Sequence, residues 1–486
     1  MAKAIRIEDA YEGCPDGLLA RFGAALAEVK GPFAEREAAA LALGNELVRR
    51  WIADELQRLS GQFGDEVVVD GQRYRRHGDG TGRYHSLCGA VAVRRASYRL
   101  VGVHNGPTVV PLELGAGLWQ NATPALAFSV TQGFASRPLR HYEAEMAAAH
   151  RRVPSRSTLE RIGKGIGCEI EATLDEAEPW LRLAEPLVKG VCSISVGLDR
   201  TTVPMSEPIS GAASPPPRLR RRPMPVAVAY RMAYVGTVSL HDRDGAVLAT
   251  KPFAATAHEG PDRLVERVMR ELIHQRARYG VPISVIQDGA PELWTLIAEA
   301  AERHAVPIAH EVIDRYHVDE RLAQVCALAT GGGRLAHELY DAWRYQLDHS
   351  DTAVDRIIRH VDALVWHACL GASEGDSAPS FWRARHVREL RGEALAAVSG
   401  HVEYLRKNRR RMRYASRRRG GLPIGSGPTE GACKSVIAVR CKRGGQRWFE
   451  SGLAPCLSLR ALHLGERLRP AFERSAAARS ATLAAA

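Results

Sequence analysis

The chain has 486 residues, 45% of them hydrophobic and 6% aromatic, so it can form roughly two to four folded domains and is not a small disulfide-stapled scaffold. Lys and Arg outnumber Asp and Glu by 67 to 55, and the net charge of +12 favours a polyanionic partner such as nucleic acid. Nine scattered cysteines without a CxxC pair indicate neither a disulfide framework nor a zinc site. The charged N-terminus and the lack of a long apolar run predict a cytoplasmic protein that does not span a membrane.

The first 115 residues are expected to combine helix with a small antiparallel sheet. Residues 17–60 place apolar side chains at helical spacing, as in FAEREAAALALGNELVRRWIADELQRL. Short runs rich in Val and Tyr, separated by Gly-marked turns, continue to about residue 110. We therefore assign residues 1–115 to an N-terminal α+β region.

Helical spacing returns in residues 116–188. Ser155 or Ser157 can cap a helix that carries Arg161 and Lys164, and this helix resembles the reading helix of a helix-turn-helix. We therefore expect a helical DNA-binding region in which Arg161 and Lys164 contact DNA. A plain helical bundle is the alternative.

From residue 189 the pattern changes to that of β-strands. The order βββαβαβ over residues 189–318 predicts a mixed sheet with helices on its faces. Asp199 and Asp288 each stand at the C-terminal end of a predicted buried strand, where a carboxylate is held rigidly beside a cleft. The alternative for either residue is an acid that simply begins the loop after a strand.

Residues 319–420 contain almost no strand signal and several helical segments, so we expect an all-helical insertion that ends in a basic segment. That segment, RKNRRRMRYASRRRG, offers many phosphate contacts, although a solvated basic face or an address signal would look the same. Its arginines expected to contact DNA are Arg409, Arg410, Arg411, Arg413, Arg417, Arg418 and Arg419. A further basic run, PPPRLRRRP (215–223), is expected to form a loop near DNA.

The stretch LPIGSGPTEGACK opens residues 421–470, the last part of the sheet domain. A helix is expected to begin near Ser426, with Ser or Thr as its N-cap, Pro428 in the first turn, and Glu430 beside unpaired backbone N–H groups. A purely helix-stabilising role is the alternative for Glu430. Basic residues that follow extend the positive surface: Lys434, Arg440, Lys442, Arg443 and Arg447. The Ala-rich residues 471–486 are expected to be disordered.

Three carboxylates, those of Asp199, Asp288 and Glu430, would together suit a hard divalent cation with oxygen ligands. We expect Mg²⁺ or Mn²⁺ as two ions roughly 3.5 to 4 Å apart, which would activate an attacking water or 3′-hydroxyl in phosphodiester chemistry. His317, in IDRYHVDERL, is a further candidate to coordinate metal or contact the phosphate, with a structural role at a helix start as the alternative.

Taken in order, the segments GLDRTTVPM, VIQDGAPELW, IDRYHVDERL and LPIGSGPTEGACKSVIAVRCKRGGQRW resemble the signature of ISKra-type transposases. These are bacterial insertion-sequence enzymes of the DDE class, related to Mutator-like elements. The last segment is the most specific, and the resemblance covers roughly residues 189–460. It implies a ribonuclease H-like catalytic core, in two parts at residues 189–318 and 421–470, interrupted by the helical insertion.

The resemblance also implies roles for individual residues. Asp199, Asp288 and Glu430 would be the three catalytic acids and metal ligands, and Asp314 and His317 would match a D-x-x-H element that assists them. The implied reaction is metal-dependent hydrolysis at the ends of the element, followed by attack of the freed 3′-hydroxyl on target DNA. Some members carry paired N-terminal cysteines, whereas in this chain only Cys88 stands in the predicted N-terminal sheet, without a partner nearby, so no zinc site is indicated.

We therefore expect a DNA transposase of the bacterial cytoplasm, associated with the nucleoid. Its partners would be double-stranded DNA, as both terminal repeats and target, and further copies of itself in a homodimer or higher homo-oligomer. Two alternatives remain open. One is another ribonuclease H-like nuclease such as a junction resolvase, and the other is a non-catalytic DNA-binding protein derived from a transposase.

Overall fold

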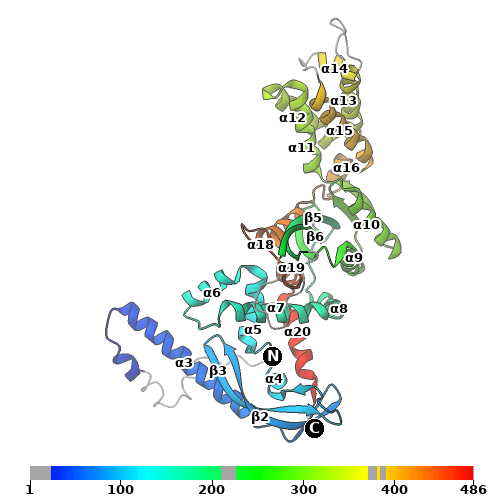
Figure 1. The fold of residues 1–486 in the computed structure, drawn as a ribbon. Helices are drawn as coiled ribbons and strands as arrows, with labels where there is room; N and C mark the ends of the chain where they lie inside the picture. Colours follow the sequence, from blue (N-terminus) through cyan, green and yellow to red (C-terminus); the bar gives the residue numbers. More distant parts are fainter. Residues whose placement is uncertain (1–22, 210–225, 370–379, 384–389, 485–486) are drawn as a thin grey trace. The chain divides into compact units, whose positions relative to one another are not determined.

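The computed structural model describes residues 23–209, 226–369, 380–383 and 390–484 (Figure 1). The chain divides into two compact units: unit 1 comprises residues 1–177 and 468–486, and unit 2 comprises residues 178–467. The basic run at 215–223 lies outside the described residues. None of the described helices is both long enough and apolar enough to cross a bilayer.

Unit 1 is built on a five-stranded antiparallel sheet that packs against the long helix α3 (Phe33–Ser60). Its strands, in the order β10-β1-β2-β3-β4, are β1 (Glu66–Val69), β2 (Gln72–Ser86), β3 (Gly89–Leu100), β4 (Thr108–Val109) and β10 (Leu483–Ala484). The expectation of disorder at 471–486 is therefore wrong for the described residues. Helix α20 (Leu468–Ala481) buries Phe472 with its ring centroid 5.2 Å from that of Trp119, and this packing carries the chain back to pair with β1.

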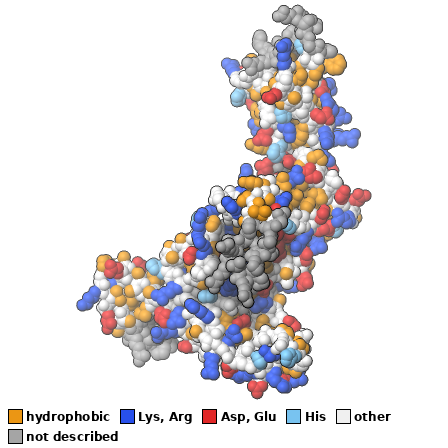
Figure 2. Space-filling view, viewed as in Figure 1, with side chains coloured by type: hydrophobic (Ala, Val, Ile, Leu, Met, Phe, Trp, Pro, Cys, Tyr) orange, Lys and Arg blue, Asp and Glu red, His pale blue; other side chains and the backbone are white. Residues whose placement is uncertain are grey.

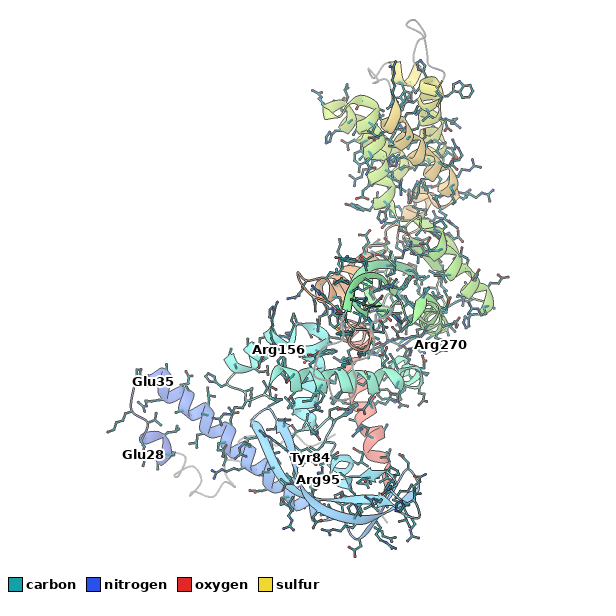
Figure 3. The ribbon with its side chains drawn as sticks, viewed as in Figure 1. Glu28, Glu35, Tyr84, Arg95, Arg156 and Arg270 are labelled. Atoms are coloured by element: carbon teal, nitrogen blue, oxygen red, sulfur yellow. The ribbon has the colours of Figure 1, made fainter. Side chains whose placement is uncertain are left out.

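A tyrosine and an arginine on the inner strands share one carboxylate at the core of this sheet. Tyr84 on β2 donates its hydroxyl to Glu113 at 2.9 Å, and Arg95 on β3 lies 3.8 Å from the same carboxylate (Figure 3). Tyr84 is 1% exposed, and its burial, followed by the nearby charge of Glu113, raises its pKa well above the ordinary value. This polar group adjoins an apolar cluster that includes Leu56, Val91, Val93, Leu112 and Leu118.

Helices follow the sheet of unit 1, as the spacing of apolar residues predicts. They are α4 (Pro111–Gly115), α5 (Pro124–Ser136), α6 (Leu139–Ala148), α7 (Arg156–Ala172) and α8 (Leu174–Ala184). Ser155 occupies the N-cap position of α7, but its side chain makes no capping hydrogen bond and instead lies 3.2 Å from the hydroxyl of Thr158. Gly163 lets α7 approach α5 closely, because a Cβ at this position would lie 2.8 Å from the Cβ of Phe134.

Unit 2 contains the mixed sheet that the sequence predicts. Its strands, in the order β7-β6-β5-β8-β9, are β5 (Ser193–Pro208), β6 (Val226–His241), β7 (Val247–Ala255), β8 (Ile283–Gln287) and β9 (His310–Ile313). The first three are antiparallel, whereas β8 and β9 run parallel to β5. Helices α9 (Gly260–Tyr279) and α10 (Pro291–Arg303) supply the crossovers that the parallel strands need.

Helices and turns make up the described residues between 319 and 420. They are α11 (Arg315–Thr330), α12 (Gly333–His349), α13 (Ala353–Cys369), α14 (Ser380–Arg383), α15 (Gly392–Asn408), the 3₁₀ helix η2 (Arg409–Arg411) and α16 (Tyr414–Arg419). Trp343 and Trp382 lie at their centre, 1% and 0% exposed, with ring centroids 5.9 Å apart and planes at 86°. Edge-to-face contact between two buried indoles stabilises this packing beyond its buried area.

The chain then returns to the sheet through an interrupted helix. Its parts are α17 (Gly427–Ala432), the π-helix η3 (Cys433–Ala438) and α18 (Val439–Cys441), and α19 (Glu450–Leu464) follows and packs on β7. A π-helical turn inside an α-helix is uncommon and is frequently found at functional sites.

A buried network of charges joins the first and last residues of unit 2. Glu271 on α9 is 0% exposed and accepts hydrogen bonds from Arg467 at 2.9 and 3.0 Å and from Arg182 at 3.2 Å. Arg182 also pairs with Glu178 at 2.8 Å, which in turn pairs with Arg267 at 2.8 Å. Because every member is buried, removing one partner leaves an uncompensated charge in the core.

Candidate active site

Two of the predicted acids lie at the same level of the sheet, Asp199 within β5 and Asp288 directly after the neighbouring strand β8. Strand β5 pairs in parallel with β8, with Val196 opposite Val285, and continuing this register sets Asp199 opposite Asp288. The main chain after Val285 stays close to β5, since the backbone N–H of Leu198 donates to the side chain of Gln287 at 3.4 Å. Asp199 is not at the end of its strand as predicted, because β5 continues to Pro208 through pairing with β6. It stands instead where β5 parts from β8.

A third acid follows the next parallel strand. Gln287, the last residue of β8, is paired with Ile313, the last residue of β9, so Asp288 and Asp314 are the first residues beyond the two strands. The backbone N–H of Asp314 donates to the carbonyl of Gln287 at 3.0 Å. Since neighbouring strands lie about 5 Å apart, Asp199, Asp288 and Asp314 begin from adjacent positions on one edge of the sheet.

Close packing brings the fourth acid, Glu430, to this edge. Thr429 on α17 hydrogen bonds to Thr237 of β6 at 2.7 Å. It also lies over Gly197 of β5, where a Cβ would approach the Thr429 hydroxyl and the Ile286 carbonyl oxygen to 2.5 Å each. The absence of a side chain at Gly197 therefore lets the first turn of α17 rest on the sheet. Glu430 lies in that first turn, as predicted.

Ser426 does not act as the predicted cap. It occupies the N-cap position of α17 without a side-chain hydrogen bond to the helix, and its hydroxyl donates to the Asp314 carboxylate. The other oxygen of Asp314 accepts from the backbone N–H of Tyr316 at 2.8 Å, so Asp314 is itself the N-cap of α11. The Ser426 hydroxyl thus fastens the segment before Glu430 to the acid edge, while the Ser426 carbonyl accepts from the backbone N–H of Glu430 at 3.0 Å and begins α17.

Asp314, His317 and Glu430 form one cluster whose ligand atoms all lie within 4.8 Å of one another. The Nε2 atom of His317 lies 3.3 Å from Glu430 Oε1, and its Nδ1 atom lies 3.4 Å from Glu320 Oε2. Asp314 is 2% exposed, whereas Glu430 and His317 are partly exposed. Glu320 was missed by the sequence reasoning, although its position three residues after His317 on a predicted helix was the available signal.

Electrostatic repulsion marks this cluster. Burial raises the pKa of Glu430 above its ordinary value and the charge of Asp314 raises it further, while His317 and Lys434 oppose the rise. A smaller contribution from Asp199 shows that this residue lies within electrostatic range of Glu430. The cluster therefore carries an excess of negative charge that a bound cation would relieve.

Asp199 and Asp288 lie at the same edge but outside the cluster. Asp199 accepts a hydrogen bond from the backbone N–H of Arg200 at 2.7 Å, and its charge, after burial, raises the pKa of the Cys433 thiol to about 12. Asp288 accepts from the backbone N–H of Ala290 at 3.0 Å. The turn after Asp288 packs under the insertion, since a Cβ at Gly289 would lie 2.2 Å from the ring of Tyr404 on α15, which overlies it.

The residues predicted to contact DNA differ in exposure. Arg417 and Arg440 are buried, 9% and 3% exposed, and so lie below the surface in this conformation. Arg417 donates to the Glu311 carbonyl at 2.6 Å, and Arg440 lies 4.8 Å from the ring centroid of Trp448, so both serve the fold. Exposed members of the predicted set are Arg409, Arg410, Arg413, Arg418, Arg419, Lys434, Lys442, Arg447 and Arg161, and partly buried members are Arg411, Arg443 and Lys164. Figure 2 shows Lys and Arg side chains spread over the visible face with acidic side chains between them.

No protein-family model matches the chain, and no curated protein matches it. Among solved structures, a strand-transfer complex of the Drosophila P element transposase is similar to this chain, with a TM-score of 0.30 and 11% sequence identity. The similarity covers 69% of this chain and 90% of that chain. A TM-score of this size does not establish a common fold, so function has to be inferred from the residues of the site.

Proposed function

We propose that this chain is a DDE-type DNA transposase that cleaves insertion-sequence ends and transfers the freed strands to target DNA with the help of divalent cations. The observation that carries the proposal is the set of acids on one sheet edge. Asp199, Asp288 and Asp314 begin at adjacent positions of three parallel strands, and Glu430 reaches the same edge on α17. Acids at the carboxyl ends of neighbouring parallel strands are placed where open α/β sheets bind ligands.

The arrangement of unit 2 supports a ribonuclease H-like core. Three antiparallel strands are followed by a helix and two parallel strands, and the helices of the insertion separate β9 from the helix that bears Glu430. This is the order that the resemblance to ISKra-type transposases implies. The insertion packs on the turn after Asp288 through Tyr404, so it helps to shape the site and is not a remote appendage.

The donor set fits a divalent cation. Asp314, His317 and Glu430 supply two carboxylates and one imidazole within 4.8 Å, and burial, followed by the charge of Asp314, raises the pKa of Glu430. Carboxylate oxygens suit Mg²⁺ and Mn²⁺, and the imidazole favours Mn²⁺ over Mg²⁺. When bound, the metal would supply Lewis-acid polarisation of a phosphate oxygen and a lowered pKa of bound water.

The chain's own residues would divide the remaining work. Glu430 from α17 and Asp199 from β5 would hold cations, and Asp288, which directly follows β8, would complete the set. Asp314, fixed by Ser426 and by the start of α11, would orient the turn that presents His317. Exposed arginines near α16 would bind phosphates and make DNA binding depend steeply on salt.

The decisive experiment combines cleavage with metal binding. The substrate is duplex DNA carrying the sequences that flank the chain's own gene, incubated with Mg²⁺ or Mn²⁺. We expect strand cleavage by the wild type and a loss of at least about a hundredfold in Asp199→Asn, Asp288→Asn and Glu430→Gln. Titration with Mn²⁺ alone should show weaker binding in Glu430→Gln and in His317→Ala.

Other outcomes separate the alternatives. Cleavage that is confined to four-way junctions would indicate a resolvase. DNA binding without cleavage and without Mn²⁺ binding would indicate a non-catalytic DNA-binding protein. Cleavage that survives unchanged in Asp199→Asn would contradict the assignment of the acids. Because two ends must be joined in concert, we also propose that the active species on DNA is a homo-oligomer, which sedimentation of the DNA complex would detect.

A further inference from the structure

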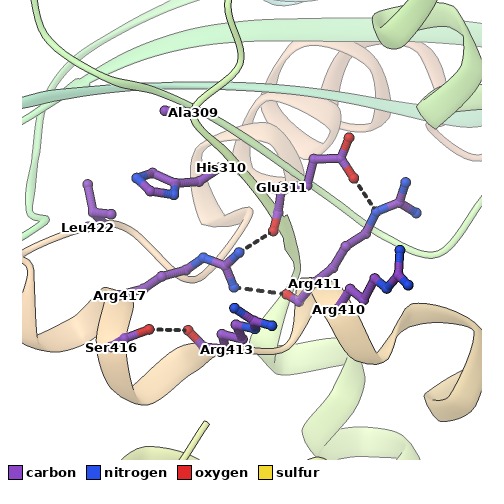
Figure 4. Close-up of a pocket in the computed structure, with 9 residues that line it drawn as sticks. All are labelled: Ala309, His310, Glu311, Arg410, Arg411, Arg413, Ser416, Arg417 and Leu422. Carbon is purple, nitrogen blue, oxygen red and sulfur yellow. Dashed lines mark hydrogen bonds and ion pairs between the residues drawn. The ribbon is translucent and has the colours of Figure 1, made fainter.

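An arginine-lined cavity lies at the opposite end of β9 from Asp314. It has a volume of about 450 Å³ and is formed by the start of β9, the 3₁₀ helix η2 and helix α16 (Figure 4). Its charged or titratable lining residues are Arg410, Arg411, Arg413, Arg417, Glu311 and His310. The volume lies in the range of pockets that take small ligands or parts of larger ones.

Two of these arginines are held rigidly by the fold. The Arg417 guanidinium donates to the backbone carbonyls of Arg411 at 3.2 Å and of Glu311 at 2.6 Å, as the dashed lines in Figure 4 show. Arg411 donates to the Glu311 carboxylate at 2.6 Å and lies 3.8 Å from the ring centroid of Trp294. The floor of the cavity is therefore organised in advance, which lowers the cost of binding.

Two other arginines have charges that are not met by an acid. Arg410 and Arg413 are exposed, and no carboxylate lies within ion-pair distance of either among the described residues. Burial, followed by the charge of Arg417, lowers the pKa of His310, so the ring is neutral near pH 7. Among the lining residues four arginines thus meet one acid, Glu311, and Asp351 adjoins the cavity through the backbone N–H of Ser416 at 3.0 Å. The cavity keeps a net positive charge suited to an anion.

The position of the cavity relates it to the acid cluster. His310 begins β9 and Asp314 follows its last residue, so the two are separated by about 13 Å at roughly 3.3 Å per residue. Neighbouring phosphates of one DNA strand are farther apart in space than their rise of about 3.4 Å along the helix axis, because the strand also winds around that axis, so this distance corresponds to about two phosphates. One nucleic acid strand can therefore reach both ends of β9.

We infer that this cavity binds one backbone phosphate of the DNA strand that is cleaved, about two phosphates from the scissile one. The inference rests on the proposed function for the location of the scissile phosphate. Exposed Arg409, Arg418 and Arg419 continue the positive surface beyond the cavity, which fits an extended polyanion better than a small free anion. The cavity would set the register of the strand, because a phosphate held in a rigid pocket fixes where the next ones lie.

The test measures DNA binding without cleavage, in the presence of a chelator. A short fluorescein-labelled DNA duplex is titrated with the full-length protein at several salt concentrations. In the double variant Arg410→Ala/Arg413→Ala we expect an affinity lower by about tenfold or more and a salt slope smaller by about 0.9, because one phosphate contact is lost. Glu311→Gln should raise the affinity, since it removes the one acid among the residues that line the cavity. Arg334→Ala is the matched control, because this exposed arginine of α12 lies outside the cavity.

An unchanged slope in the double variant would overturn the inference. A second outcome would also overturn it: the double variant loses binding of pyrophosphate, measured by calorimetry, but binds the duplex with wild-type affinity. The cavity would then be a site for a free anion and not for DNA. Single methylphosphonate substitutions test the register: neutralising the phosphate about two positions from the cleaved bond should weaken wild-type binding but not binding by the double variant. If cleavage is never observed while the double variant still lowers the slope, the proposed function fails and the phosphate pocket stands.

Discussion

Replacing Gly197 by alanine should displace Glu430 from the acid edge without removing any functional group. The new Cβ would lie 2.5 Å from the Thr429 hydroxyl and from the Ile286 carbonyl oxygen, whereas ordinary contact begins at 3.4 Å. Both contacts must therefore lengthen by about 0.9 Å. The Ile286 carbonyl belongs to β8, so relieving that contact strains the pairing of β5 with β8, while relieving the contact with Thr429 displaces the first turn of α17 and Glu430 with it. Functional constellations tolerate about 0.5 Å, and a misplacement of about 1 Å costs on the order of a hundredfold in rate.

The assay is Mn²⁺-dependent cleavage of the flanking-sequence duplex, together with thermal unfolding of the same samples. We expect cleavage by Gly197→Ala to fall by about a hundredfold, with a loss of roughly 1–3 kcal/mol in stability from overpacking. Gly431→Ala is the matched control, because it lies on the same helix as Glu430 and a Cβ there meets nothing within 4 Å. Cleavage by folded Gly197→Ala within twofold of the control would refute the claim that this contact positions Glu430.

Three further predictions concern charge. Burial alone would raise the pKa of Glu271, but Arg467, then a hydrogen bond from Gln275 and the charge of Arg182 hold this pKa at about 2. The contribution of Glu271 to stability is therefore present above an ordinary pKa of 4.5 and is lost as the pH falls toward 2. Arg467→Met should therefore lower the free energy of unfolding by about 3–5 kcal/mol at neutral pH, and by less near pH 3, as denaturant titrations would measure. An equal loss at both pH values would contradict the buried-charge explanation. The pKa of Glu430 is raised, so its ionised form destabilises the metal-free protein once the pH exceeds that pKa. Without metal, Glu430→Gln should therefore unfold at a higher temperature than the wild type. With Mn²⁺ at a hundredfold excess over Kd, the wild type should gain about 2.7 kcal/mol of stability and the variant should not. Ser426→Ala removes a hydrogen bond from the buried Asp314 carboxylate and should cost about 1–3 kcal/mol, which calorimetry would measure; a cost near zero would mean that the hydroxyl contributes nothing to holding the site.

The secondary structure of unit 2 was largely predictable from local pattern. Apolar runs interrupted by turns mark the strands, and the amphipathic spacing of α9 marks the crossover helix. The placement of Glu430 in the first turn of a helix also follows from local signals, because Pro428 and the glycines before it are typical of a helix start. These features depend only on neighbours in the chain.

The partners of the acids were not predictable in this way. Local sequence predicts that the Ser426 hydroxyl caps its own helix. In the structure the hydroxyl donates instead to Asp314, 112 residues away in the sequence. Arg417 and Arg440 look like their exposed neighbours in the sequence, but each is buried against groups that no local pattern identifies. The choice among possible partners is made by the packing of distant segments.

By itself, the sequence determined the mixed α/β character of unit 2, the positions of Asp199 and Asp288 in or just after apolar strands, and the basic segment before Glu430. Only the tertiary structure decided that the register of β5, β8 and β9 brings three acids to one level, with Asp314 nearest to Glu430. It also decided that the C-terminal residues pair with β1. The physical reason is that strand register and side-chain burial depend on contacts between residues far apart in the chain, which composition and periodicity do not encode.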